Sequence, residues 1–234
     1  MISYKGKELW TYFFNKQKNH YNKYMFEMIN YDQYLIFAEN EIKELKGTWS
    51  KSSFLNSNPL FLEIGSGSGN FLIQLAQNNK EKNFIGDELR LKRLVYAARK
   101  AKNIDLKNIK FIRIDANKIE EFIDNNELSG VYINFPDPWE KNVKKRILSE
   151  NLLNKLYPLL KKDGKIYFKT DHLDYYNSVL DLVNSRSDYK VLIYTDDLYS
   201  TEYIKNNIKT EFEHLFINKL KISIKYIEIV KCGD

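Results

Sequence analysis

The chain has 234 residues, enough for one large domain with a well-buried core. It is basic, with 37 Lys and Arg against 31 Asp and Glu and a net charge of +6, which suits a polyanionic partner. A single cysteine, Cys232, excludes a disulfide framework, three scattered histidines offer no spacing for a metal site, and no apolar run reaches the ~18 residues of a membrane span. We therefore expect a cytoplasmic protein without a metal or a secretory leader.

Residues 1–58 differ in character from the rest of the chain. Aromatic side chains and lysines interleave there, and because no proline precedes Pro59, helix is permitted from about residue 7 to residue 45. Such side chains can stack on bases and neutralise phosphates, or they can pack on the main domain, which is the interpretation we favour. The interleaved residues are Trp10, Tyr12, Phe13, Phe14, Lys16, Lys18, Tyr21, Lys23, Tyr24 and Phe26. With a Ser- and Asn-rich linker at Lys51–Asn58, we predict a helical extension at residues 1–58 and one domain at residues 59–234.

From Pro59 onward, strand and helix patterns alternate. Strands are predicted at Leu60–Ile64, Asn83–Glu88, Ile109–Ile114, Gly130–Phe135, Lys165–Thr170, Tyr189–Tyr194 and Lys221–Val230. Helices are predicted at Phe71–Gln77, Arg90–Lys102, Ile119–Ile123, Ser149–Lys161 (with Ser149 as N-cap) and Tyr175–Asn184, and a turn at Asp163–Gly164. This alternation predicts an α/β fold with a doubly wound, Rossmann-like, seven-stranded and mostly parallel sheet. The last two strands lack a helical crossover, so we expect an antiparallel strand pair at the sheet edge.

The first of these strands leads into a glycine-rich loop with Gly65, Gly67 and Gly69. Glycines let a backbone turn tightly and approach a ligand closely. The dinucleotide fingerprint would need a further glycine where the chain has Asn70, and the Gly-Lys-Ser/Thr of a phosphate loop is absent. Glu63, just before the glycines, would repel a phosphate. The loop therefore suits a ligand that is cationic at this end.

Two more carboxylates follow the next two strands. Glu88 ends the second strand, where a carboxylate can accept both ribose hydroxyls. Asp115 ends the third strand, and together with the Ala116 amide it can hold an adenine amine and ring nitrogen. Each acid alone could merely cap a helix, but three around one glycine loop indicate a positively charged nucleoside. S-adenosylmethionine fits this description and NAD does not.

The fourth strand runs into Asn134-Phe135-Pro136-Asp137-Pro138-Trp139. Two prolines bracket Asp137 and stiffen the loop, and the carboxyl end of a central strand is where open α/β sheets place their chemistry. The alternative is a rigid turn in which Trp139 covers the core. The basic run that follows, with Lys141, Lys144, Lys145 and Arg146, would bind RNA phosphates beside such a site, whereas alone it would indicate a solvated face.

Four segments then carry a family resemblance: the Glu63–Gly69 loop, Asn134–Trp139, Phe168-Lys169-Thr170-Asp171 and Thr210-Glu211-Phe212-Glu213. In this order and spacing they resemble the bacterial tRNA (guanine-N7)-methyltransferases, over roughly residues 47–230. The glycine loop alone would indicate only a class I methyltransferase. The chain departs from the family pattern in three places. Asp87 stands where an apolar residue is usual, and Lys219–Lys221 lacks a common glycine. The loop after Trp139 is one residue shorter than usual, and Glu140 stands in it where proline is frequent.

The resemblance implies an enzyme that uses S-adenosylmethionine to form 7-methylguanosine in tRNA, expected in the variable loop. Glu63, Glu88, Asp115 and Asp137 would line the donor pocket, and Asp137 is the residue usually given a catalytic role. Lys141, Asp171 and the segment from Thr210 through Glu211 and Phe212 to Glu213 would contact the RNA. We expect tRNA as the partner, with no membrane and no obligatory protein partner, and either a monomer or a homodimer.

The chemistry of guanine N7 limits what the enzyme must do. N7 is a bare lone pair, so catalysis is by positioning, and we interpret Asp137 as a positioner and charge stabiliser rather than an obligatory base. Either Glu213 or Asp171 could accept the N1–H and N2–H of guanine. Thr210 and Glu213 also have the spacing of a capping box, which would leave Glu213 bonded to backbone.

Rival interpretations remain open from the sequence. A methyltransferase acting on another RNA nucleobase is one, and an RNA-binding protein that keeps the fold without activity is another. An amino-methyltransferase would need Asn/Asp-Pro-Pro-aromatic after the fourth strand, where Phe135 separates Asn134 from Pro136. A nicotinamide dehydrogenase is disfavoured by the glycine spacing.

Overall fold

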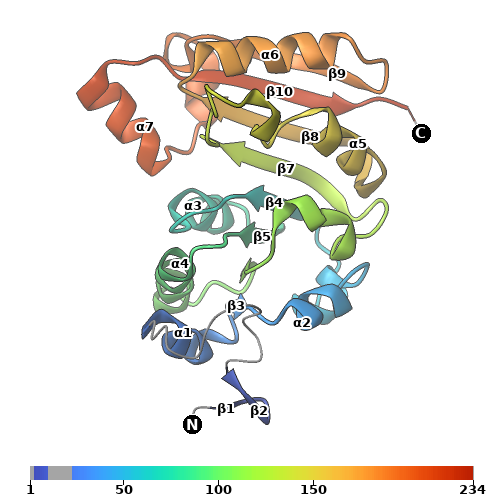
Figure 1. The fold of residues 1–234 in the computed structure, drawn as a ribbon, viewed down its shortest axis with the longest axis vertical. Coiled ribbons are helices and arrows are strands. Elements are labelled where there is room, and N and C mark those ends of the chain that lie inside the picture. Colours follow the sequence, from blue (N-terminus) through green and yellow to red (C-terminus); the bar gives the residue numbers. More distant parts are fainter. Residues whose placement is uncertain (1–2, 10–22, 234) are drawn as a thin grey trace.

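The computed structural model describes residues 3–9 and 23–233, which form one central sheet flanked by helices (Figure 1). The order of the eight strands is β3-β6-β5-β4-β7-β8-β10-β9. Their bounds are β3 Leu35–Ile36, β4 Leu60–Ile64, β5 Asn83–Asp87, β6 Ile109–Ile112, β7 Leu128–Asn134, β8 Leu160–Thr170, β9 Tyr189–Thr195 and β10 Lys225–Lys231. A separate hairpin pairs β1 (Ser3–Tyr4) with β2 (Lys7–Glu8).

The predicted mostly parallel sheet is confirmed, and it differs from the prediction in the number of its strands. All strand pairs from β3 to β8 are parallel, and β10 is antiparallel to both neighbours. The predicted antiparallel pair at the sheet edge is formed by β10 and β9, with β10 between β8 and the edge strand β9. An eighth strand, β3, joins from the N-terminal region. It consists of two residues, too few for a pattern in the sequence to reveal.

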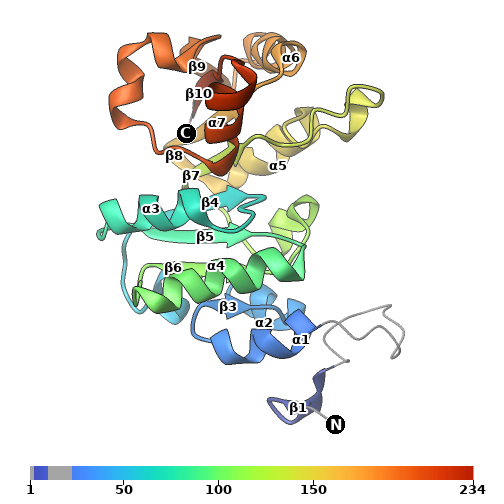
Figure 2. The same cartoon turned by 90° about the vertical axis from the view of Figure 1, so that its left-hand side faces the viewer.

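Helices cover both faces of the sheet (Figure 2). The bounds of the larger ones are α1 Lys23–Met28, α2 Glu39–Glu44, α3 Asn70–Asn78, α4 Leu91–Asn103, α5 Glu150–Leu159, α6 Leu173–Asn184 and α7 Glu211–Leu215, with a 3-10 helix η4 at Ala116–Glu121. Residues of α1, α3 and α4 share one hydrophobic core with Phe61, while η4, α5 and α6 share the other with Leu60 and Leu62. Successive side chains of a strand point to opposite faces, so the buried strand β4 contributes to both cores.

The part of the predicted extension that the structure describes packs on the sheet. Met25 and Met28 of α1 are fully buried, and β3 pairs with β6. Trp49 is also buried, and its indole N–H donates to the main-chain oxygen of Phe122 at 2.7 Å. Of the interleaved residues, Lys23, Tyr24 and Phe26 are described, and those from Trp10 to Tyr21 lie outside the described residues.

Two local predictions take a different form in the structure. The predicted Asp163–Gly164 turn lies inside β8, where Leu128 pairs with Leu160 and Gly130 with Lys165, so the intervening residues bulge out of the ladder, with Asp163 at φ 59°. Ser149 stands at the N-cap of α5, but its side chain makes no capping bond and donates instead to the Ile147 main-chain oxygen at 3.4 Å.

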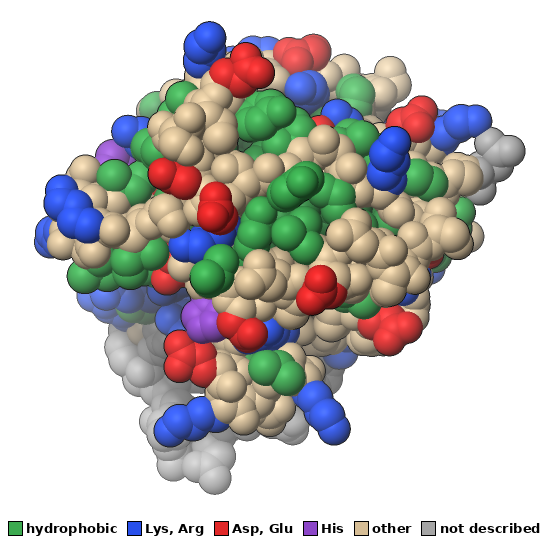
Figure 3. Space-filling model, turned by 90° about the horizontal axis from the view of Figure 1, so that it is seen from above, with side chains coloured by type: hydrophobic (Ala, Val, Ile, Leu, Met, Phe, Trp, Pro, Cys, Tyr) green, Lys and Arg blue, Asp and Glu red, His purple; other side chains and the backbone are tan. Residues whose placement is uncertain are grey.

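The surface at the α6 and β9 end mixes acidic and basic side chains around gathered apolar ones (Figure 3). On the edge strand β9, Leu192 and Tyr194 are 45% and 66% exposed. Among the described residues no helix is both long and apolar enough to cross a membrane.

Candidate active site

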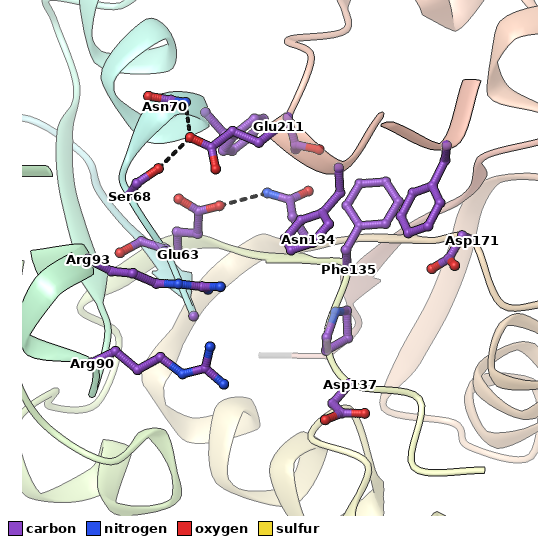
Figure 4. A pocket seen from close by; sticks show the side chains of 18 of the residues that line it. Glu63, Ser68, Asn70, Arg90, Arg93, Asn134, Phe135, Asp137, Asp171 and Glu211 are labelled. Carbon is purple, nitrogen blue, oxygen red and sulfur yellow. Dashed lines mark hydrogen bonds between the residues drawn. The ribbon is translucent and has the colours of Figure 1, made fainter. Parts of the chain in front are cut away.

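A cavity of about 390 Å³ opens at the carboxyl ends of the central strands (Figure 4). This is where ligands bind in open α/β sheets. It combines three segments far apart in the sequence: the glycine-rich loop, the Asn134–Pro138 loop and the start of α7. Its lining residues are Glu63, Gly65, Ser66, Gly67, Ser68, Asn70, Phe71, Arg90, Arg93, Asn134, Phe135, Pro136, Asp137, Pro138, Asp171, Thr210, Glu211, Phe212 and Phe216.

The glycine-rich loop turns as tightly as predicted. Gly65 and Gly69 have φ values of 74° and 77°, in the left-handed region that glycine tolerates best. At Gly69 a Cβ would also lie 2.8 Å from both the Ala97 Cβ and the Phe111 ring, so a side chain is excluded by space as well. The loop thereby leads directly into α3, with the cavity on its outer side.

Glu63, which is buried, and Asn134, which is half-buried, meet in the lining of the cavity. Glu63 Oε1 accepts a hydrogen bond from Asn134 Nδ2 at 2.9 Å, while Glu63 Oε2 and Asn134 Oδ1 are buried without a partner among the described residues. Burial raises the pKa of Glu63 to about 7, although the Asn134 bond and the Lys169 charge act in the opposite direction. Asn134 is not among the site residues predicted from the sequence. Its place as the first residue of the Asn134–Pro138 loop, hereafter the proline loop, is the signal that could have identified it.

The other predicted donor residues lie beside the cavity rather than in its lining. Glu88 is buried, accepts the Arg90 N–H at 2.8 Å and lies 3.7 Å from the Arg93 guanidinium. Asp115 caps η4, accepting the Asn117 N–H at 2.9 Å. Ala116 is the first residue of η4. Each carboxylate thus already accepts a local main-chain hydrogen bond, and the donor contacts of Glu88 and Asp115 stay predictions.

The proline loop is displayed rather than buried. Asp137 is exposed and lines the cavity, with Oδ1 3.5 Å from the Trp139 main-chain nitrogen. Trp139 is 40% exposed and the Lys145 ammonium lies 4.8 Å from its ring centroid, so this tryptophan does not cover the core. Phe135 adopts φ 49° and directs its ring to those of Phe212 and Phe216, at centroid distances of 6.0 and 5.5 Å.

The basic run divides into exposed lysines and one buried arginine. Lys141, Lys144 and Lys145 are exposed. Arg146 is 7% exposed and donates to the Pro138 main-chain oxygen at 2.8 Å, to Ser178 Oγ at 3.0 Å and to Asp174 Oδ2 at 2.5 Å. The structure therefore uses Arg146 to hold the proline loop on α6, and leaves only the lysines free to meet a phosphate.

The residues of the Thr210–Glu213 segment also differ in their environment. Glu213 is fully buried and absent from the cavity lining: its carboxylate accepts from the Thr210 N–H at 2.6 Å and Asn207 Nδ2 at 2.8 Å, and lies 3.4 Å from the Lys169 ammonium. Because Thr210 Oγ1 accepts the Glu213 N–H in return, both bonds of the capping box are present. This geometry favours the capping role of Glu213 over a contact with guanine.

Thr210, Glu211 and Phe212, in contrast, do line the cavity. The Glu211 carboxylate reaches across to the glycine-rich loop, accepting from Ser68 Oγ at 2.5 Å and from Asn70 Nδ2 (Figure 4). Asp171, directly after β8, lies half-buried on the opposite side of the cavity from Glu63. The predicted site residues Asp137 and Asp171 therefore line the same cavity as the glycine-rich loop.

Comparison with known proteins finds relatives that resemble this chain in sequence and solved structures that resemble it in fold. A family model described as "Putative methyltransferase" matches residues 57–225. A bifunctional glycosyltransferase/methyltransferase of Fusobacterium nucleatum is 50% identical over 98% of this chain, which spans only 36% of that protein's length. A tRNA (guanine-N(7)-)-methyltransferase of Clostridium novyi is 36% identical over 77% of this chain and 84% of its own. Among solved structures, the antibiotic-resistance methyltransferase Kmr superposes with a TM-score of 0.56 at 13% identity, covering 78% of this chain and 91% of that one, which shows a shared fold.

Proposed function

The chain belongs to the tRNA (guanine-N7)-methyltransferase family, and on this premise we propose that it transfers a methyl group from S-adenosylmethionine to N7 of a guanosine in tRNA. The observation that carries the proposal is the single cavity shared by the glycine-rich loop, the Asn134–Pro138 loop and the start of α7. Relatives named for this reaction, such as the Clostridium novyi protein, support the choice of substrate.

The residues at the glycine-rich end of the cavity fit a cationic donor. Glu63 Oε2 and Asn134 Oδ1 are buried acceptor atoms without a partner in the described part of the chain, and a positively charged ligand with N–H donors would satisfy them. The backbone of Gly65 and Gly67 leaves room for close approach. S-adenosylmethionine, when bound, supplies a methyl group on a positively charged sulfur. Glu63 and the loop would hold it, with Glu88 and Asp115 at the neighbouring strand ends.

The other end of the cavity suits the acceptor base. Guanine N7 needs no deprotonation, so the protein has to align it and exclude water. Methylation leaves the guanine cationic, and the carboxylates of Asp137 and Asp171 line the cavity where they can stabilise that charge. Asp137 then acts as a positioner and charge stabiliser, and no general base is required.

Base recognition falls to the residues that remain available. With Glu213 committed to the capping box, Asp171 is the carboxylate that can accept the N1–H and N2–H of guanine. The rings of Phe135, Phe212 and Phe216 offer a surface on which a base extruded from its stack can lie. The exposed Lys141, Lys144 and Lys145 would bind flanking phosphates. Methylation in the variable loop belongs to the proposal through the family resemblance.

The test is mass spectrometry of nucleosides from tRNA incubated with the protein and isotopically labelled S-adenosylmethionine. We expect labelled 7-methylguanosine as the methylated product. A different labelled nucleoside would assign the protein to a methyltransferase of another RNA base. Binding of tRNA without any labelled product, with donor binding absent by calorimetry, would instead support a protein that keeps the fold without activity.

A further inference from the structure

Asp87, the last residue of β5, lies behind the glycine-rich loop and outside the cavity lining. Its carboxyl Oδ1 accepts the Gly65 N–H at 2.6 Å. Its main-chain oxygen accepts the Ser66 N–H at 2.7 Å and the Ser66 hydroxyl at 3.0 Å. Gly65 and Ser66 both line the cavity. One residue therefore fixes two consecutive peptide units of the loop that faces the donor.

The second carboxyl oxygen of Asp87 lies in a buried and acidic environment. Oδ2 is buried and has no hydrogen-bond partner among the described residues. The charged groups that act on Asp87 are carboxylates from the adjacent strand ends, Glu88, Glu63 and Asp115. Burial, reinforced by these charges and opposed by the Gly65 N–H, raises the pKa of Asp87 to about 8. The carboxyl group of Asp87 therefore holds its proton to a higher pH than an ordinary aspartate does.

Glu63, with its pKa raised to about 7, belongs to the same buried acidic group. A cation in the cavity favours the ionised form of both side chains, so its binding is coupled to proton release and strengthens as pH rises. A neutral ligand of the same shape lacks this coupling. S-adenosylmethionine carries a positive sulfur, and its demethylated product, S-adenosylhomocysteine, carries a neutral one. The two ligands have nearly the same shape and differ in the charge on sulfur. The ratio of their affinities therefore measures the effect of the charge of the site, and the affinity for the product measures the effect of its shape.

We propose, resting on the methyltransferase function above, that Asp87 is a positioning residue of the donor site with two effects. Its side chain and main chain hold Gly65 and Ser66 in the shape that binds the donor. Its carboxyl group also makes the site favour the cationic donor over the neutral product increasingly as pH rises. The second effect would assist product release, because the product keeps the ammonium group but lacks the positive sulfur and so gains less from the ionised carboxyl group.

Two substitutions separate these effects. Asp87→Asn keeps an oxygen that can accept the Gly65 N–H but cannot ionise, and Asp87→Leu removes both properties. We expect isothermal calorimetry between about pH 6 and pH 9 to show a wild-type affinity ratio of donor to product that rises severalfold with pH. Asp87→Asn should bind the product within about twofold of wild type. Its donor-to-product affinity ratio should rise less with pH, and the rise should stop once Glu63 is ionised. Asp87→Leu should weaken both ligands by about tenfold, because the Gly65 amide loses its partner.

Glu228→Gln is the matched control, since Glu228 is a buried carboxylate of β10 outside the cavity. It should leave both affinities and their pH dependence unchanged, and melting temperatures will identify any variant that fails to fold. An unaltered pH dependence in Asp87→Asn would overturn the charge effect, and wild-type affinities in Asp87→Leu would overturn the positioning effect. Failure of the wild-type protein to bind either ligand would overturn the proposed function itself, and this inference with it.

Discussion

The carboxylates of Glu63 and Asp137 line the same cavity but lie in different environments, which suit different roles. Glu63 is buried against Asn134, and its ionisation is opposed by desolvation. Asp137 is held at the cavity mouth between Pro136 and Pro138, exposed to water. A cation beside a buried acid favours its ionised form, which suits a residue proposed to hold the donor, whereas an exposed, fixed carboxylate can respond to charge that develops on the substrate.

Asp137→Asn tests the second role. The substitution preserves the size of the side chain and the prolines around it, so the fold and donor affinity should remain close to wild type. The substitution removes the negative charge proposed to stabilise the methylated guanine, so we expect single-turnover methylation to slow by roughly 10- to 100-fold. Rapid-quench measurement at saturating tRNA and donor is the check. A rate within about twofold of wild type would remove Asp137 from the charge-stabilising role.

Glu213 should behave as a structural residue. Glu213→Ala breaks the capping box and leaves the Lys169 ammonium buried without its acidic partner, so the free energy of unfolding should fall by about 3–5 kcal/mol. Glu213→Gln can preserve the box and should cost clearly less. Urea denaturation measures both. If instead Glu213→Gln unfolds like wild type and loses only activity on tRNA, then Glu213 reads the base and the capping role is secondary.

At the scale of elements, loops carry the site because the sheet fixes their ends. The proline loop leaves β7 and is held by Arg146, whose bonds to the Pro138 main chain and to Asp174 join it to α6. The segment after it displays Lys144 and Lys145 to solvent. Such an arrangement presents cationic side chains beside the cavity at a fixed position, which is what binding of flanking phosphates requires.

Replacing Lys144 and Lys145 together with Ala should weaken tRNA binding similarly for different tRNA sequences. If each contacts one phosphate, the slope of log affinity against log salt should decrease by roughly 1 to 2. Filter binding at several salt concentrations measures this. Lys161→Ala, an exposed lysine near the start of β8, is the control and should change neither value. Unaltered affinity and slope in the double variant would assign the run to a solvated face.

Lys221 marks the end of the helical turn at Phe216–Leu220, in a position where glycine is favoured. It adopts φ 56° as the C-cap residue, which a side chain with a Cβ tolerates at a cost. Lys221→Gly should therefore raise the free energy of unfolding by about 1 kcal/mol and the melting temperature by about 2–4 °C. Lys219→Gly, two positions earlier inside the turn, should have the opposite effect. Lower stability in Lys221→Gly would show that the lysine side chain compensates for the strain.

For the whole molecule, the sequence predicted what depends on local pattern and missed what depends on distant partners. Buried strands such as β4 appear as uninterrupted apolar runs, so the sheet and its glycine loop were foreseeable. Arg146 and Glu213 were expected at the RNA because they stand in charged or family-like motifs. Arg146 binds Asp174, 28 positions away, and Glu213 meets Lys169, 44 positions away, and only the fold brings these pairs together. The capping box between Thr210 and Glu213, in contrast, follows from their spacing in the sequence.

The buried acids also make a prediction for the stability of the whole molecule. Glu63 and Asp87 have pKa values raised to about 7 and about 8, above those of an unfolded chain, so the folded protein holds more protons than the unfolded one between about pH 4 and pH 8. Their contribution to stability is fully present below the unfolded pKa values and is lost as pH rises through the folded ones. We therefore expect the free energy of unfolding of the donor-free protein to decrease from pH 5 to pH 8.5, at up to about 1.4 kcal/mol per pH unit for each group. Urea denaturation across this range is the measurement. Asp87→Asn should flatten the upper part of the decline, and a saturating cationic donor should reduce it. A stability that rises with pH over the same range, or an identical decline in the variant, would show that these two carboxyl groups are ionised in the folded, donor-free protein.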